Sequence, residues 1–126
     1  MGYTASYVPV RAYTISIDTT RMDKVLAISP EDMTVTVQAG CSWLALNEAL
    51  KPHGLRTPFW GTFSGKHATI GGALSQGAKF FGSGNRGSAA ESVLGLEVVV
   101  GDGSVVMTGS AGTPHQPTPF YRYYGP

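Results

Sequence analysis

The chain has 126 residues, of which 42% are hydrophobic and 13% are charged, and its formal net charge is +1. This length allows one domain with a modest core, and the near-zero charge excludes a basic face for nucleic acid. The longest apolar run, around residues 98–100, is far too short to span a membrane. We also expect no signal peptide. The single cysteine, Cys41, excludes an internal disulfide and indicates a reducing, cytoplasmic setting.

Three strands are predicted in the first third of the chain, over residues 13–17, 24–29 and 33–39. Thr14, Ile15, Ser16 and Ile17 alternate between polar and apolar, and Val35 and Val37 share one face of the third strand. Short turns separate the strands, with Pro30 well placed in the second turn. This spacing predicts an antiparallel meander with one buried face.

A helix is predicted over residues 43–51, with Ser42 as its N-cap. Its apolar face holds Trp43, Leu44, Leu46, Asn47 and Leu50, and Gly54 is the expected left-handed terminator. A long loop over residues 58–67 follows, and loops of this length are more often functional than idle.

A second, short helix is expected from Gly72 to about Ala78, and one helical turn over residues 88–92. Residues 93–100 and 104–108 are predicted to form a hairpin around Gly101-Asp102-Gly103. Residues 111–126 are expected to be an irregular tail. The predicted fold is therefore α+β, with an antiparallel sheet of about five strands and two or three helices.

Gly82-Ser83-Gly84-Asn85-Arg86-Gly87 matches the dinucleotide pattern G-x-G-x-x-G. The pattern indicates a phosphate loop only when it follows a strand and opens a helix of a βαβ unit. Here it follows a small-residue helix and precedes a hairpin. We interpret it as a flexible loop, with a nucleotide phosphate-binding protein as a low-ranked alternative.

The titratable residues do not form a predicted catalytic or metal site. His53, His67 and His115 lack metal-ligand spacing, with His53 and His67 expected at the surface. Cys41 is expected to be a small buried thiol, since no partner for a nucleophile lies near it in sequence. Most carboxylates fall in turns, where Asp is common, and no acid–base pair is indicated.

The segment Ala68-Thr69-Ile70-Gly71-Gly72 is the strongest candidate for a ligand site. Thr69 carries a hydroxyl, and Gly71 and Gly72 are predicted to present unpaired backbone amides at a helix start, where an anion is favoured. A packing contact that requires glycine explains the same residues equally well. The segment alone does not separate these two interpretations.

Several sequence blocks in a fixed order favour the ligand site over the packing contact. Residues 17–26, 34–40, 46–50, 68–72 and 93–99 resemble the FAD-binding domain of the vanillyl-alcohol oxidase superfamily. The nearest members are FAD-linked 2-hydroxyacid dehydrogenases of the glycolate oxidase and D-lactate dehydrogenase type. The resemblance covers residues 2–109 and implies that residues 1–110 form the second subdomain of an FAD-binding module.

The resemblance also implies roles for individual residues. Thr69, Ile70, Gly71 and Gly72 match the family segment that contacts the flavin and diphosphate. Gln76 and Gly77 match positions beside the cofactor, and Val93 matches a backbone contact with FAD. Arg86-Gly87 replaces the usual Tyr-Gly, so an aromatic contact is not expected there. The family's cap domain and catalytic residues lie outside the matched segment, so no catalytic residue is assigned.

The leading hypothesis is therefore part of an FAD-linked oxidoreductase that moves a hydride from a small hydroxylated substrate to flavin N5. The parent protein's substrate would bind through an absent cap domain, and the isolated chain is expected to bind FAD weakly or not at all. The main alternative is a non-catalytic α+β interaction module whose exposed aromatic patch, Phe59, Trp60, Phe80 and Phe81, engages another protein or drives self-association.

Overall fold

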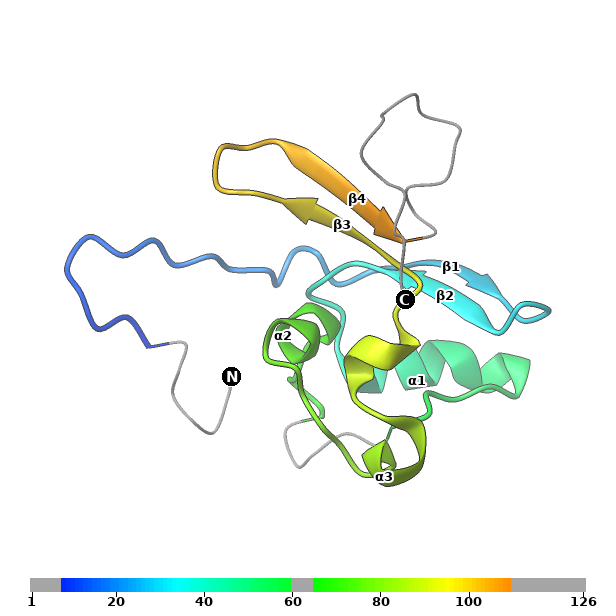
Figure 1. Cartoon of the computed structure of the whole chain (residues 1–126). Coiled ribbons are helices and arrows are strands. Elements are labelled where there is room, and N and C mark those ends of the chain that lie inside the picture. The colour runs from blue at the N-terminus through cyan, green and yellow to red at the C-terminus, as the bar shows by residue number, and fades with distance from the viewer. Residues whose placement is uncertain (1–7, 60–64, 110–126) are drawn as a thin grey trace, which may run out of the picture. The chain divides into compact units, whose positions relative to one another are not determined.

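A computed structural model describes residues 8–59 and 65–109, and contacts divide the chain into two units, Met1–Glu91 and Ser92–Pro126. The predicted tail and Trp60 lie outside the described residues. The elements, labelled in Figure 1, are β1 (Val25–Ser29), β2 (Thr34–Val37), α1 (Trp43–Leu50), the 3₁₀ helix η1 (Lys51–His53), α2 (Ile70–Ser75), α3 (Ser83–Arg86), the 3₁₀ helix η2 (Ala89–Ser92), β3 (Gly95–Val99) and β4 (Val105–Gly109).

Strands β1 and β2 form an antiparallel hairpin in the first unit, which confirms two of the predicted strands. Ser29 pairs with Thr34 across the turn, and the Met33 amide donates to the Pro30 carbonyl at 3.3 Å. Met33 closes this turn with a φ of 52°, a left-handed conformation that L residues other than Asn and Asp rarely adopt. Val35 and Val37 both pack toward α1, as their alternation predicts.

The prediction of a strand over residues 13–17 is wrong. This segment is not assigned as a strand, and Ile15 and Ile17 are 86% and 83% exposed. Alternation gives the segment β propensity, but a strand also needs a partner edge, and within the described ranges its backbone pairs with none. The expected sheet of about five strands is thus replaced, in the described part of the chain, by two antiparallel sheets of two strands each. The α+β class is confirmed.

Helix α1 forms where its N-cap and apolar face predict it. The Ser42 hydroxyl accepts a hydrogen bond from the Ala45 amide at 3.1 Å, and Trp43, Leu46 and Leu50 are buried. Leu44 is 47% exposed, so its assignment to the apolar face is wrong: it lies one residue, or about 100°, from Trp43. Gly54 ends η1 with a φ of 67°, as predicted.

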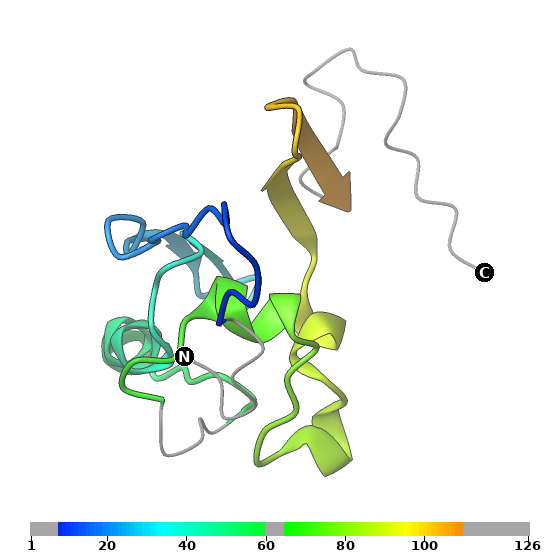
Figure 2. The ribbon, with the colours of Figure 1, turned by 90° about the vertical axis from the view of Figure 1, so that its left-hand side faces the viewer.

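The core of the first unit consists of two clusters. The aliphatic cluster, Cys41, Leu46 and Leu50, is covered by side chains of β1 and β2. The aromatic cluster is built on Trp43, Phe59, Ala73 and Ala89, with Phe80 packed against it. Figures 1 and 2 agree that the β1–β2 hairpin lies over α1, which Figure 2 views along its axis. Ile70 packs against both clusters and therefore joins them.

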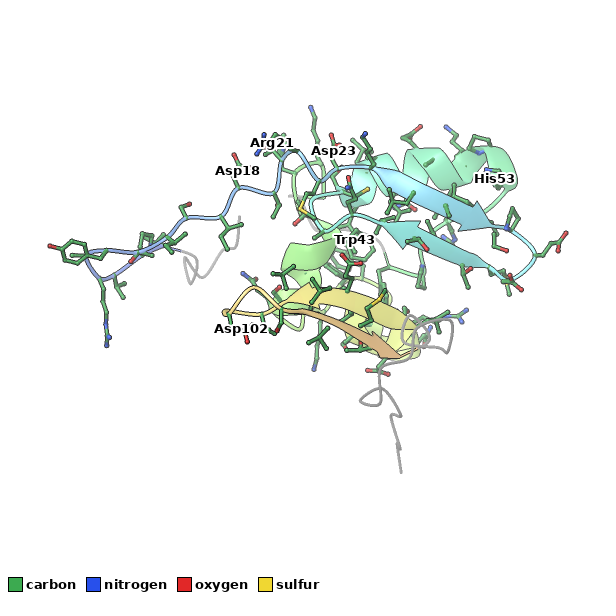
Figure 3. The ribbon with its side chains drawn as sticks, turned by 90° about the horizontal axis from the view of Figure 1, so that it is seen from above. Asp18, Arg21, Asp23, Trp43, His53 and Asp102 are labelled. Atoms are coloured by element: carbon green, nitrogen blue, oxygen red, sulfur yellow. The ribbon has the colours of Figure 1, made fainter. Side chains whose placement is uncertain are left out.

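The second unit contains the β3–β4 hairpin, as predicted. Gly95 pairs with Gly109 and Val99 with Val105. The turn is closed by the Gly103 amide, which donates to the Val100 carbonyl, and by the Asp102 carboxylate, which accepts from the Ser104 amide and hydroxyl. Asp102 lies at the tip of this hairpin (Figure 3).

Candidate functional site

The start of α2 is fixed by residues that precede and open α1. Ser42 and Thr69 form an isolated antiparallel bridge, and the Trp43 amide donates to the Ala68 carbonyl at 3.1 Å. The Ile70 amide donates in return to the Cys41 carbonyl at 2.8 Å. Residues 68–71 therefore run beside residues 39–43, and two segments that are distant in sequence hold each other in place.

The backbone amides at the start of α2 are all paired within the chain. The Gly71 amide donates to the Ala39 carbonyl at 2.8 Å, and the Gly72 amide donates to the Thr69 hydroxyl at 3.2 Å. Thr69 is thus the N-cap of α2. The prediction that Gly71 and Gly72 present unpaired amides is wrong, because their partners are supplied by the segment before α1 and by the cap.

Gly71 is a glycine for packing reasons. A Cβ on Gly71 would lie 2.7 Å from the Ala39 Cβ and 2.9 Å from the Ala39 carbonyl oxygen. The packing interpretation of the glycine pair therefore holds for Gly71. Gly72 differs: it is exposed, and the one atom that would lie within 4 Å of a Cβ on it is the hydroxyl oxygen of its own cap, Thr69.

The exposed side of α2 carries two small residues and one longer polar residue. Gly72, Ser75 and Gln76 are exposed and lie three and four residues apart, so they share one face of the helix. The Ser75 hydroxyl donates back to the Gly71 carbonyl at 2.8 Å, which keeps it close to the backbone. Gly77 follows with a φ of 57° and open space around it. Gly72, Ser75, Gln76 and Gly77 are hereafter the α2 face, and the missing side chain of Gly77 leaves the backbone there open to close approach.

Two predicted cofactor residues, Ile70 and Val93, are not part of the α2 face. Ile70 is a half-buried core residue. Val93 is half-buried and belongs to the second unit, just before β3. The α2 face thus brings together Gly72, Gln76 and Gly77, while Thr69, Ile70 and Gly71 hold the helix that carries it.

The G-x-G-x-x-G segment forms α3, so its interpretation as a flexible loop is wrong. Gly82 and Gly87 bound this helical turn with φ values of 105° and 72°, and both conformations favour glycine. The amides of Asn85, Arg86 and Gly87 donate to carbonyl groups of the same segment, and the Ser83 amide donates to the Phe80 carbonyl just before it. These four amides are thus already paired, which disfavours the alternative of a nucleotide phosphate cradle.

Helical turn η2 forms as predicted, and the Glu91 carboxylate binds the residue that precedes it. In Ser88-Ala89-Ala90-Glu91, the Glu91 carboxylate accepts from the Ser88 amide at 2.9 Å and from its hydroxyl at 3.3 Å. The S-x-x-E spacing in the sequence places Glu91 where its carboxylate can accept hydrogen bonds from Ser88.

The prediction of an exposed aromatic patch is wrong for Phe59 and Phe80. Phe59 is 2% exposed, and Phe80 packs edge-on against Trp43 with ring centroids 5.1 Å apart. Only Phe81 of the described members is strongly exposed, at 68%. Phe59 and Phe80 are core residues because Trp43 supplies an aromatic partner from α1.

The titratable residues lie where the sequence places them. His53, which ends η1 and is labelled in Figure 3, and His67 are exposed, whereas Cys41 is buried. Burial, followed by the negative charge of Asp23, raises the pKa of the Cys41 thiol. Across residues 8–59 and 65–109, no group of three His, Cys, Asp or Glu side chains could hold a metal ion. In the same ranges, none of the helices has the length and apolar character needed to cross a bilayer.

Comparisons with known proteins identify the family. Residues 3–109 match the family model of the FAD binding domain. The chain is 32% identical to the mitochondrial D-lactate dehydrogenase [cytochrome] 1 of Saccharomyces cerevisiae, over 75% of this chain and 16% of that enzyme. It is 36% identical to the mitochondrial D-lactate dehydrogenase [cytochrome] of Arabidopsis thaliana, over 76% and 16%. It is 34% identical to the glycolate oxidase subunit GlcD of Bacillus subtilis, over 70% and 18%.

The chain therefore spans less than a fifth of the length of these relatives. The match with the family model, by contrast, extends over nearly all of the described residues. The chain belongs to the FAD binding domain family.

Proposed function

We propose that this chain is part of an FAD-linked oxidoreductase that oxidises a small 2-hydroxy acid. The observation that supports this most is the shared chemistry in the names of its relatives. D-lactate and glycolate both carry a hydroxyl on the carbon next to a carboxylate. Oxidation of such a substrate to the 2-oxo acid releases a hydride from that carbon and a proton from its hydroxyl. When bound, FAD supplies the two-electron acceptor for this chemistry.

The chain's own part in this function is to bind and orient the cofactor. We assign the contacts to Thr69, Ile70, Gly71, Gly72, Gln76, Gly77 and Val93. The α2 face fits this role because Gly77 leaves open space at the backbone and Gly72 is exposed. The amides of Ile70, Gly71 and Gly72 are paired within the chain. We therefore expect them to position α2, while other parts of the parent protein hold the diphosphate.

A partial site predicts weak binding of FAD. Titration of FAD with the purified chain, followed by flavin fluorescence, tests this. We expect a dissociation constant well above about 1 µM, which corresponds to roughly −8 kcal/mol. Sub-micromolar binding would refute the proposal that the chain carries only part of the cofactor site.

Two variants of equal charge locate the contact in the same titration. Gln76→Glu adds a negative charge on the α2 face, and Ala90→Glu adds the same charge at an exposed position in η2. Gln76→Glu should weaken FAD binding severalfold, because FAD is an anion, and Ala90→Glu should not. Equal effects of the two variants would remove the α2 face from the proposal.

Self-association is a second candidate function, favoured by the β3–β4 hairpin. Both of its faces carry exposed apolar side chains, with Leu96 and Val98 on one and Val99 and Val105 on the other. Such surfaces promote association with another protein or another copy. Sedimentation of the chain at several concentrations, without FAD, separates a self-associating module from a monomeric cofactor-binding fragment.

A cytoplasmic location is also part of the proposal. It is supported by Cys41, which is a buried free thiol and therefore needs no oxidising compartment. Fractionation of the source cells with an antibody against the chain tests it.

A further inference from the structure

A cavity of about 380 Å³ lies in the first unit, and none of the residues assigned to FAD lines it. It is lined by two segments that are distant in sequence, residues 56–59 and a second group comprising Phe81, Gly82, Asn85 and Arg86. This volume falls within the roughly 300–1,000 Å³ typical of small-molecule sites.

The walls of this cavity are held by specific contacts. The Thr57 amide donates to Asn47 Oδ1 on α1 at 3.0 Å, and the Thr57 hydroxyl lies 2.7 Å from the Phe59 carbonyl oxygen. Phe59 is anchored in the aromatic cluster. A Cβ on Gly82 would lie 2.8 Å from the Pro58 carbonyl oxygen, so this glycine allows α3 to approach Pro58 closely. The two lining segments are therefore fixed against each other.

The cavity has a strongly one-sided charge. Arg56 and Arg86 both line it, and no carboxylate does. Among the described residues, neither guanidinium has an ion pair or a hydrogen bond. Two cations at one cavity repel each other, and an anion between them relieves that repulsion. Guanidinium groups also match the geometry of carboxylate and phosphate groups.

Among the lining residues, the amides of Thr57, Asn85 and Arg86 are already paired within the chain, which favours side chains as the donors at this cavity. Exposed arginines are often merely solvated. Here two of them, from separate segments, meet at one cavity with fixed walls and no acidic residue. Phe81 adds an exposed apolar surface at its edge.

We propose that this cavity binds an oxyanion, the carboxylate or phosphate group of a small molecule, through Arg56, Arg86 and the side-chain amide of Asn85. The proposal does not depend on FAD binding, and the α2 face takes no part in it.

Nuclear magnetic resonance of the intact chain tests it, by following the Arg Nε–H and Asn side-chain amide signals at constant ionic strength. Sodium pyrophosphate is the phosphate probe, and sodium D-lactate is the carboxylate probe. We expect saturable shifts of the Arg56, Arg86 and Asn85 signals with at least one probe. Arg56→Gln or Arg86→Gln should then weaken binding about tenfold, as expected for loss of a charge-assisted hydrogen bond.

Lys79→Gln is the matched control, since Lys79 is an exposed cation outside the cavity lining. A response to pyrophosphate alone assigns a phosphate-bearing ligand, and a response to D-lactate alone assigns a carboxylate. The absence of saturable shifts, or an equal loss of binding in Lys79→Gln, would overturn the proposal. The titration of the unchanged chain shows whether the cavity binds either probe, even if a variant fails to fold. Failure here leaves the FAD titration unaffected, so the two proposals can fail separately.

Discussion

Gly40 and Gly71 occupy positions where a Cβ has no room. A Cβ on Gly40 would overlap the Thr19 carbonyl oxygen and lie 2.8 Å from that of Met22. The Gly40 amide donates to the same Met22 carbonyl at 2.7 Å, which fixes the turn before β1 against the end of β2. A Cβ on Gly71 would lie 2.7 Å from the Ala39 Cβ, which is also too close for an ordinary contact. These two glycines therefore bring the segment before α1 into contact with its neighbours.

Gly40→Ala and Gly71→Ala should each lower the free energy of unfolding by about 1–3 kcal/mol, since the new methyl group meets backbone or Ala39, which cannot rotate away. Urea denaturation followed by circular dichroism measures this. Gly84→Ala is the control, because nothing lies within 4 Å of its Cβ position. An unchanged midpoint for Gly71→Ala would show that Gly71 is not a packing residue.

Cys41 gives a prediction on pH. Burial, and then the charge of Asp23, raises the pKa of its thiol in the folded chain. The thiol therefore keeps its proton more firmly in the folded than in the unfolded state. The burial of the protonated thiol therefore contributes fully to the stability of the fold at pH values below the pKa of an unfolded thiol, about 8.5. This contribution is lost as the pH rises through the higher pKa of the folded state.

The stability of the unchanged chain should therefore fall as the pH rises above about 8.5, and it should fall less steeply in Cys41→Ala. Urea denaturation of both chains across this range measures the difference. Parallel pH profiles would contradict the assigned pKa shift.

At the scale of the elements, local turn chemistry determines the β3–β4 hairpin. Gly103 has a φ of 85°, and its amide bonds to Val100 across a three-residue loop. Such loops combine a type I turn with a left-handed residue, which explains the glycine. Gly101 has no neighbour within 4 Å and no left-handed conformation, so it provides a control within the same turn.

Gly103→Ala should destabilise the hairpin by about 1 kcal/mol, the approximate cost of a left-handed L residue. Gly101→Ala should cost less. Amide hydrogen exchange of Val98 and Val106 measures the opening of this hairpin separately from the first unit. Equal exchange in the two variants would show that the turn does not require a left-handed residue at position 103.

Elements defined by local signals could be predicted from the sequence. Ser42 and the spacing of Trp43, Leu46 and Leu50 were sufficient for α1, and Asp102-Gly103 was sufficient for the second hairpin. Elements that depend on distant partners could not. Ile15 and Ile17 have strand propensity without a partner edge among the described residues. The amides of Ile70 and Gly71 are paired with carbonyls about thirty residues away, which no local pattern reveals.

The candidate site was predictable to a similar degree. The segment from Thr69 to Gly72 was located by its resemblance to a family, and the family match confirms the cofactor. Packing determines which residues of this segment are exposed: Ile70 and Gly71 face protein, while Gly72 faces solvent. The cavity with Arg56 and Arg86 has no counterpart in the sequence pattern, because it requires two segments to meet.

At the scale of the whole molecule, the chain contains two small units, each built on a two-stranded sheet. Two-stranded hairpins are marginally stable unless another element covers them. The first hairpin is covered by α1, whereas the β3–β4 hairpin retains exposed apolar side chains on both faces. Together with the length of the relatives, this supports a chain that carries part of a cofactor site.

The most direct test of that claim maps FAD binding residue by residue. Backbone amide signals of the intact chain are followed by nuclear magnetic resonance during titration with FAD. We expect weak binding, with the largest shifts at Gly72, Gln76, Gly77 and Val93. Sub-micromolar binding would contradict a partial site, and unchanged signals at these four residues at millimolar FAD would contradict its location.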